Sequence, residues 1–195
     1  MSKKQAILEV ATKLFSKNGF KDTSMADLAK LIGTAQGTIF YHFNSKEQLF
    51  LAVLKSVKER IIDEFKVHLR EKEYKTGLDM VEDAVSFYLY LAGAMEDQFL
   101  LLHRHDAYEL AQGNTICRQN LEDIYNSILD IFEKAVLLGQ EDGSIEEMPA
   151  RKTALIIFAM VDGLVRFNTY KLYDAGALYN ELIASCRRIL QNKPS

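Results

Sequence analysis

The chain has 195 residues, a formal net charge of −3 and only two prolines. This length allows one domain or two small ones with a buried core, and the many Leu, Ile, Ala, Lys and Glu residues favour an all-α protein. The longest uninterrupted apolar run, Ala154 to Val161, excludes a membrane-spanning helix, and no signal-peptide pattern precedes residue 20. We therefore expect a cytoplasmic protein that does not associate with membranes.

The charge is distributed unevenly along the chain. Residues 1–60 hold ten Lys/Arg and five Asp/Glu, a net of +5, whereas the remainder holds fourteen and twenty-two, a net of −8. A basic head on an acidic body is typical of a phosphate-binding module joined to a domain with another partner. Cys117 and Cys186 are isolated and lack metal-ligand spacing, so we expect buried free thiols rather than a redox pair.

The N-terminal segments follow a helical pattern. Apolar residues at helical spacing predict a first helix from about Lys3 to Asn18, ended by Gly19. Ser24, with an acidic residue three positions on, predicts the start of a second helix, which Gly33 stops. A third helix of about two turns follows and carries Ile39, Phe40 and Phe43 inward. Two short helices around a glycine, with an apolar anchor on the second, form the pattern of a helix-turn-helix.

The order ILEVATKLFSKNGFKDTSMADLAKLIG followed by GTIFYHFNSKEQLFLAVL closely resembles the N-terminal domain of the tetracycline-repressor (TetR) family of transcriptional regulators. The resemblance covers about residues 6 to 54, and no comparable motif follows. It implies a DNA-binding head on a divergent helical body. It also implies base contacts along the stretch from Ala35 to Tyr41.

The chemistry of the side chains suggests how this segment binds DNA. Gln36 can bond bidentately to adenine, the Thr38 methyl can touch thymine, and Gly37 lets the helix approach the groove closely. Phosphate contacts are predicted for the residues Ser24, Tyr41, His42 and Lys46. Lys46 is the strongest of these, because Ser45 to Gln48 forms a capping box that opens the next helix.

Two positions depart from the family pattern. Thr34 and Ala35 stand where an aliphatic residue and a Ser or Thr cap are usual, so Thr34 could take over the cap and shift the contacts. Phe40 replaces the usual tyrosine and removes a phosphate-binding hydroxyl, for which Tyr41 could substitute.

Further helices are predicted over residues 46–70, 78–94, 97–111, 115–138, 150–172 and 176–191, for about nine helices in all. Helix 46–70 begins at the DNA and ends in the body, so it couples the two regions. We predict a helix-turn-helix DNA-binding domain over residues 1–46 and a helical ligand-binding and dimerisation domain over residues 47–195.

The body is rich in aromatic residues, which either fill its core or enclose a pocket for an apolar ligand. The resemblance favours a pocket, for which the predicted lining residues are Phe65, Phe87, Phe99, His103, Tyr125, Phe132 and Asn168. The string His103 to Asp106 contains two histidines, but on one helix they point about 200° apart. Polar residues at a pocket edge or on the surface are therefore favoured over a metal site. No nucleophile motif or phosphate loop is present, so we predict a protein that is not an enzyme and needs no cofactor.

The last two predicted helices carry more apolar surface than one seam needs, with small residues at i,i+4. This resembles the two-helix face through which the family forms dimers. The predicted interface residues are Phe158, Ala159, Asp162, Gly163, Arg166, Leu182 and Cys186.

These predictions describe a homodimeric regulator, more often a repressor, that binds a palindromic double-stranded DNA operator and releases it when a small apolar effector binds. Two alternatives stay open. One is a regulator of the same fold controlled by a protein partner or by no ligand, and the other is a small-molecule sensor that has lost operator binding.

Overall fold

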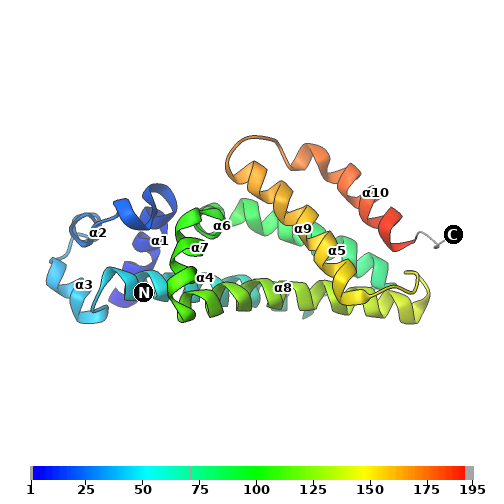
Figure 1. Ribbon diagram of the computed structural model, residues 1–195, viewed down its shortest axis with the longest axis horizontal. Helices are drawn as coiled ribbons and strands as arrows, with labels where there is room; N and C mark the ends of the chain where they lie inside the picture. The colour runs from blue at the N-terminus through cyan, green and yellow to red at the C-terminus, as the bar shows by residue number, and fades with distance from the viewer. Residues whose placement is uncertain (1, 71, 192–195) are drawn as a thin grey trace. The chain divides into compact units, whose positions relative to one another are not determined.

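The computed structural model describes residues 2–70 and 72–191 of the chain. Within these ranges it contains α-helices, one short 3-10 helix and no strand, which confirms the all-α prediction. Figure 1 follows the helices from α1 in blue to α10 in red. In chain order they are α1 (Lys3–Asp22), α2 (Met25–Ile32), α3 (Gln36–His42), α4 (Lys46–Arg70), α5 (Gly77–Ala94), α6 (Glu96–His103), α7 (His105–Gly113), α8 (Thr115–Asp142), α9 (Ala150–Thr169), η1 (Gly176–Leu178) and α10 (Tyr179–Leu190).

The chain divides into two compact units. The first unit contains Met1–Ile61 and Met95–Ile124, and the second contains Ile62–Ala94 and Tyr125–Ser195. Helices α6 and α7 thus belong with the N-terminal helices, although they lie far along the sequence. The predicted boundary at residue 46 separates a DNA-binding domain from a ligand-binding domain, and it stays a prediction.

Local capping interactions define the helices of the first unit. The Ser24 Oγ accepts a hydrogen bond from the Asp27 N–H at 3.0 Å, as its spacing predicted. The Ser45 Oγ accepts one from the Gln48 N–H at 3.1 Å, and the Gln48 side chain accepts in return from the Asn44 N–H. These bonds satisfy backbone donors that a helix start leaves without a partner, so they fix where α2 and α4 begin.

The C-terminal end of α1 is kinked at Gly19. This residue has φ of 88° and ψ of 170°, a conformation that essentially only glycine adopts. The predicted end of the helix at this glycine is therefore confirmed as a break in helical geometry. The residues from Phe20 to Asp22 form the last turn of α1 and lead to the N-cap residue Ser24.

Two features stabilise the second unit. One is close backbone packing of α5 against α8, and the other is a cluster of polar side chains around Asp83. A side chain at Gly77 would lie 2.0 Å from the Gly139 backbone nitrogen, so only glycine allows α5 to meet α8 this closely. Further along α5, the Asp83 carboxylate lies 2.7 Å from both His68 Nε2 and the Tyr74 hydroxyl. Burial alone would raise the pKa of Asp83, but hydrogen bonds from Lys72, Tyr74 and His68 lower it below its usual value.

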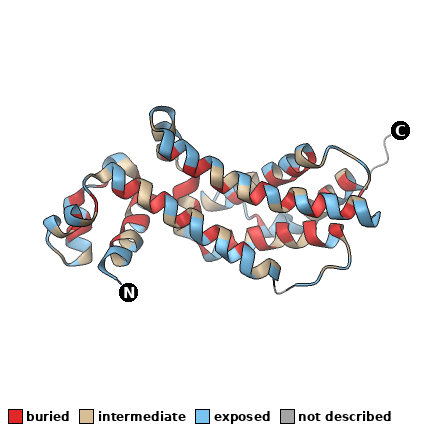
Figure 2. Ribbon diagram, turned by 90° about the horizontal axis from the view of Figure 1, so that it is seen from below, coloured by how far each residue is buried: buried red, intermediate tan, exposed pale blue. Residues whose placement is uncertain are grey.

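Several boundary predictions were wrong, including those for the helix predicted over 115–138, which ends at Asp142, and for the helix predicted over 150–172, which ends at Thr169. The predicted helix 97–111 is two helices, because Arg104 is extended, with φ of −72° and ψ of 145°. The last helix begins at Tyr179 rather than at residue 176, after the short 3-10 helix. Figure 2 shows that buried residues line one side of most helices and exposed residues the other, as amphipathic helices require. None of the helices in the described part of the chain combines the length and the apolar character that a membrane span needs.

Candidate nucleic-acid interface

Helix α3 presents a well-defined outer face. Ile39 and Phe43 are buried and anchor the helix in the first unit. The exposed residues of the helix are Gln36, Gly37, Phe40 and Tyr41, and we call this set the recognition face. Tyr41 is 84% exposed, which leaves its hydroxyl free to reach a partner. Thr38 and His42 flank this face and are half-buried.

The turn before α3 fixes the angle between α2 and α3. Gly33 is left-handed, with φ of 71°, and the Thr34 N–H donates to the Ala29 carbonyl at 3.0 Å. Ala35 is the N-cap residue of α3 and gives no side-chain hydrogen bond. The alternative in which Thr34 takes over the cap is therefore wrong, because the N-cap of α3 lies one residue later, at Ala35.

Lys46 is held in place within the first unit. Its ammonium donates to the Lys21 carbonyl at 3.2 Å and lies 4.6 Å from the centroid of the Phe20 ring. A lysine ammonium has three hydrogens, so two are left to bind another group. The Lys46 side chain is therefore partly covered by Phe20 and Lys21 at the end of α1, unlike a fully exposed surface lysine.

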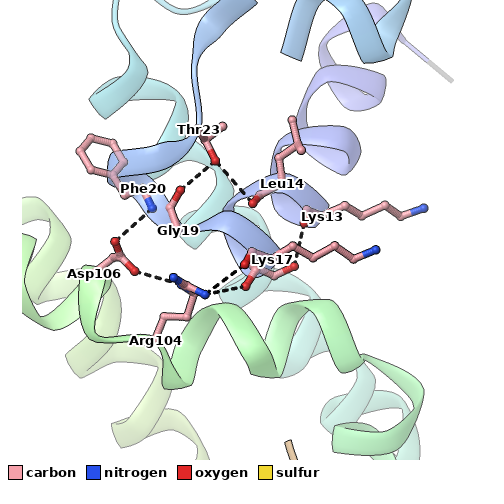
Figure 3. Close-up of polar contacts among 9 residues, drawn as sticks. Lys13, Leu14, Lys17, Gly19, Phe20, Thr23, Arg104 and Asp106 are labelled. Carbon is pink, nitrogen blue, oxygen red and sulfur yellow. Dashed lines mark hydrogen bonds and ion pairs between the residues drawn. The ribbon is translucent and has the colours of Figure 1, made fainter. Parts of the chain in front are cut away.

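The C-terminal part of α1, around the kink at Gly19, is also held by the break between α6 and α7 (Figure 3). Arg104 donates to the carbonyls of Ser16 at 3.2 Å and Lys17 at 3.3 Å, near the end of the regular part of α1. Asp106 accepts from the Phe20 N–H at 3.1 Å and from Arg104 Nε at 3.0 Å. We call these bonds the Arg104–Asp106 clasp.

The clasp explains the helix break, whereas the positive φ of Gly19 explains the need for glycine. An extended residue at position 104 lets Arg104 and Asp106 point at the same turn, which one continuous helix would prevent. A Cβ on Gly19 would lie 2.6 Å from the Arg104 guanidinium. Burial alone would raise the pKa of Asp106, but hydrogen bonds from Arg104 and the Phe20 N–H lower it below its usual value.

The sequence offered only a partial indication of this clasp. Arg104 and Asp106 lie inside the string that was considered as a metal site or a polar edge. The prediction that His103 and His105 share one helix is wrong, because α6 ends at His103 and α7 begins at His105. No group of three or more His, Cys, Asp or Glu side chains among the described residues is arranged to share a metal ion.

The residues predicted to line an effector pocket fall into three groups. Phe65, Phe87, Tyr125 and Phe132 belong to the second unit, where rings pack against one another. The rings of Tyr125 and Phe132 lie about 6 Å from that of Phe158, and Phe65 lies 4.9 Å from Phe87, edge to face. These are contact distances for aromatic pairs, so the rings of this cluster pack against one another.

The remaining predicted pocket residues lie elsewhere. Phe99 and His103 are buried on α6 in the first unit, with ring centroids 6.3 Å apart. Asn168 is exposed on α9, and its side-chain oxygen accepts from the Ala175 N–H at 3.4 Å. Asn168 therefore stabilises the turn between α9 and η1, and its role as a polar anchor of a pocket stays a prediction.

The predicted interface residues on α9 and α10 divide by burial. Phe158, Leu182 and Cys186 are buried against their own chain and cannot offer surface to a partner, which corrects their assignment. Ala159 and Arg166 are exposed, and Asp162 and Gly163 are half-buried. Exposed apolar residues surround them: Leu155, Ile156 and Leu178, which the sequence indicated as excess apolar surface, and Phe167, Tyr170, Leu172, Tyr173 and Tyr179, which it did not.

Both cysteines are buried and free, as predicted. Burial raises the pKa of each thiol to about 11, so neither is a reactive thiolate at neutral pH.

Comparison with known proteins identifies the family. Residues 7–53 match the model of the N-terminal domain described as bacterial regulatory proteins, tetR family. The HTH-type transcriptional regulator ArpR of Pseudomonas putida is 30% identical over 168 residues, which cover 82% of this chain and 76% of ArpR. The chain belongs to the TetR family of bacterial regulatory proteins.

Other TetR-family relatives match along nearly the whole chain. The fatty acid metabolism regulator protein of Bacillus subtilis (strain 168) is 25% identical over 191 residues, covering 96% of this chain and 95% of the relative. FadR from Bacillus subtilis, solved in complex with stearoyl-CoA, superposes with a TM-score of 0.76 at 23% identity, over 97% of this chain and 99% of that chain. A regulator from Saccharomonospora viridis in complex with choline gives 0.81 at 20% identity, over 97% and 96%. The two solved structures show the shared fold.

Proposed function

We propose that this TetR-family chain is a repressor that binds a palindromic DNA operator as a homodimer and releases it when a small, largely apolar effector binds. The observation that carries the proposal is the recognition face of α3. It is exposed and partly polar, and buried Ile39 and Phe43 hold it in a basic N-terminal part of the chain. A short helix fixed in this way suits the DNA major groove.

Operator selection from random duplex DNA tests this proposal. We expect enrichment of a sequence with two half-sites about one helical turn apart, because each subunit would place one α3 in the major groove. A Gln36→Ala variant should bind the selected operator less tightly but retain salt-dependent binding to unrelated DNA, since only base recognition is lost. If no sequence is enriched, operator binding is refuted and the small-molecule sensor is the better interpretation.

The exposed apolar surface of α9 supports the proposed dimer. Leu155, Ile156 and Ala159 lie within one turn of one another on α9, and Phe167 and Tyr170 continue the exposed surface toward its end. Contiguous exposed apolar patches of this kind mark interfaces between proteins. Gly163 lies among them, and a Cβ there would meet nothing within 4 Å in the single chain.

A substitution at Gly163 can therefore test dimer formation without disturbing the fold of the single chain. Gly163→Arg should leave the helix content of the chain unchanged but convert a dimer to monomers in sedimentation velocity, because a buried unpaired charge is costly. Gly163→Ala is the matched control and should stay dimeric. A dimeric Gly163→Arg protein would place the interface elsewhere.

The aromatic cluster of the second unit supports an apolar effector. Its rings are in contact, so a ligand must separate them, and burying its own apolar surface would compensate for this. One relative of this fold was solved with stearoyl-CoA, whose acyl chain is apolar, and another with choline. We propose an effector with an apolar tail.

Release of labelled operator by a panel of compounds tests the effector. Acyl-CoA thioesters of graded chain length, free coenzyme A and choline form a suitable panel. We expect release to increase with chain length and to be absent with free coenzyme A. Release by none of the compounds would favour control by a protein partner.

A further inference from the structure

The recognition face of α3 contains an aromatic hydrocarbon. Phe40 is 41% exposed, although its neighbour Ile39 is fully buried. The phenyl ring has no hydrogen-bonding group, so it cannot take over the phosphate contact of the tyrosine that usually stands here in the family. A single exposed phenylalanine is ordinary on a protein surface. Its position relative to Gly37 is what points to a role.

Phe40 and Gly37 are neighbours on the helix surface. Residues three apart on a helix lie on the same side, and side chains lean toward the N-terminal end. Phe40 and Gly37 therefore project from the same side of α3. A Cβ at Gly37 would meet nothing within 4 Å, so the protein itself does not require glycine there. This side of the helix thus combines a bare backbone at Gly37 with an exposed phenyl ring one turn further on.

The DNA major groove offers one apolar group that the exposed ring of Phe40 can contact. Base edges there present hydrogen-bond donors and acceptors, and the C5-methyl group of thymine is the only apolar group among them. Residues 1–60 carry a net charge of +5, which draws this surface to a polyanion. The missing side chain at Gly37 allows the backbone to approach a base edge closely.

We propose that Phe40 is a specificity-determining residue that recognises the C5-methyl group of a thymine in each operator half-site, with Gly37 providing the space. This inference rests on the proposed operator binding. Contact of Phe40 with the sugar-phosphate backbone is the competing arrangement, and it would not depend on the methyl group.

Replacement of thymine by deoxyuridine tests the proposal, because it removes only the methyl group and leaves the hydrogen-bonding edge intact. Each thymine of one half-site of the selected operator is replaced in turn, and dissociation constants are measured at fixed salt. One replacement should weaken binding of the wild-type protein about fourfold, the equivalent of about 0.8 kcal/mol for one buried methyl-sized group. A 5-bromodeoxyuridine at that position should restore binding, since bromine is close to methyl in size.

Variants of Phe40 assign the effect to this side chain. Phe40→Ala should bind the thymine and deoxyuridine operators equally, whereas Phe40→Leu should keep part of the preference because it remains apolar. Tyr41→Phe, at the neighbouring exposed position, should keep the whole preference. Circular dichroism and retained binding to unrelated DNA show that each variant is folded.

The outcomes are distinguishable. A thymine preference that vanishes in Phe40→Ala supports the inference. Equal wild-type affinity for every deoxyuridine operator overturns it, as does a preference that survives in Phe40→Ala, and both leave operator binding intact. Failure of the selection to enrich any operator overturns the inference together with the proposed function.

Discussion

Around Gly19 the first unit is fastened by hydrogen bonds of fixed geometry, whereas around Phe158 the second unit is filled by aromatic rings. In the first unit Arg104 and Asp106 bind backbone groups of α1, and Thr23 donates to the Gly19 carbonyl at 2.8 Å. In the second unit the Phe158 ring lies 5.4 Å from that of Tyr88 and about 6 Å from those of Tyr125 and Phe132.

The difference concerns how much each region tolerates substitution. A hydrogen bond to the backbone needs one donor or acceptor at one position, so few replacements preserve it. Apolar contacts are not directional, so residues of similar volume can replace one another. The first unit can thus hold a recognition face at a fixed angle while the second can diverge in sequence.

The largest effect expected is at Phe132, which is fully buried. Phe132→Ala should lower the free energy of unfolding by about 3–5 kcal/mol, because it leaves a cavity. Phe132→Leu should cost far less, about 1.5 kcal/mol or below, if the second unit tolerates apolar exchange. Urea unfolding followed by circular dichroism measures both. Equal losses would mean that this core is as specific as the clasp.

Gly19→Ala should come next, with a loss of about 2–4 kcal/mol from backbone strain and from displacement of Arg104. The same urea measurement applies. Gly37→Ala is the matched control in a helix with open space, and it should raise the free energy of unfolding by about 0.5–1 kcal/mol. A neutral Gly19→Ala would show that the clasp is not needed to hold the turn.

The Asp106 carboxylate makes the first unit sensitive to acid. Its pKa is lowered by folding, so its contribution is present above its unfolded pKa and is lost as pH falls through the folded value below 3.8. The urea midpoint of the wild-type protein should therefore fall between about pH 5 and pH 3 more steeply than that of Asp106→Asn. Parallel pH profiles would remove Asp106 from this role.

The smallest effect concerns DNA. Lys46→Ala should weaken binding to all sequences alike and reduce the slope of log affinity against log salt by about one unit. Lys55→Ala, an exposed lysine of α4 paired with Glu59, is the control and should leave the slope unchanged. An unchanged slope for Lys46→Ala would mean that this ammonium only stabilises the end of α1 and does not contact phosphate.

The sequence predicted the devices of the first unit that act locally. The caps at Ser24 and Ser45 and the turn at Gly33 each depend on residues within four positions, and all are present. The break at Arg104 was missed because neither glycine nor proline marks it. Contacts of Arg104 and Asp106 with α1, more than eighty residues away in sequence, stabilise the break instead.

The candidate site was predictable in position but not in every residue. Helical spacing predicted that Ile39, Phe40 and Phe43 face inward, which is correct for Ile39 and Phe43 and wrong for Phe40, whose side chain is 41% exposed. The aromatic character of Phe40 favoured a core position, so its exposed ring was not predicted. On α9 and α10, apolar residues that face inward and outward have the same composition, and only the fold separates buried Phe158 from exposed Leu155.

The position of Lys46 has a consequence for the entropy of binding. An exposed lysine loses rotamer freedom when it binds a phosphate, which costs about 0.5–1.5 kcal/mol for such a side chain. The ammonium of Lys46 is already confined between the Phe20 ring and the Lys21 carbonyl. Folding has therefore ordered this side chain before any anion arrives, and a phosphate can bind its remaining hydrogens with little further loss of conformational freedom.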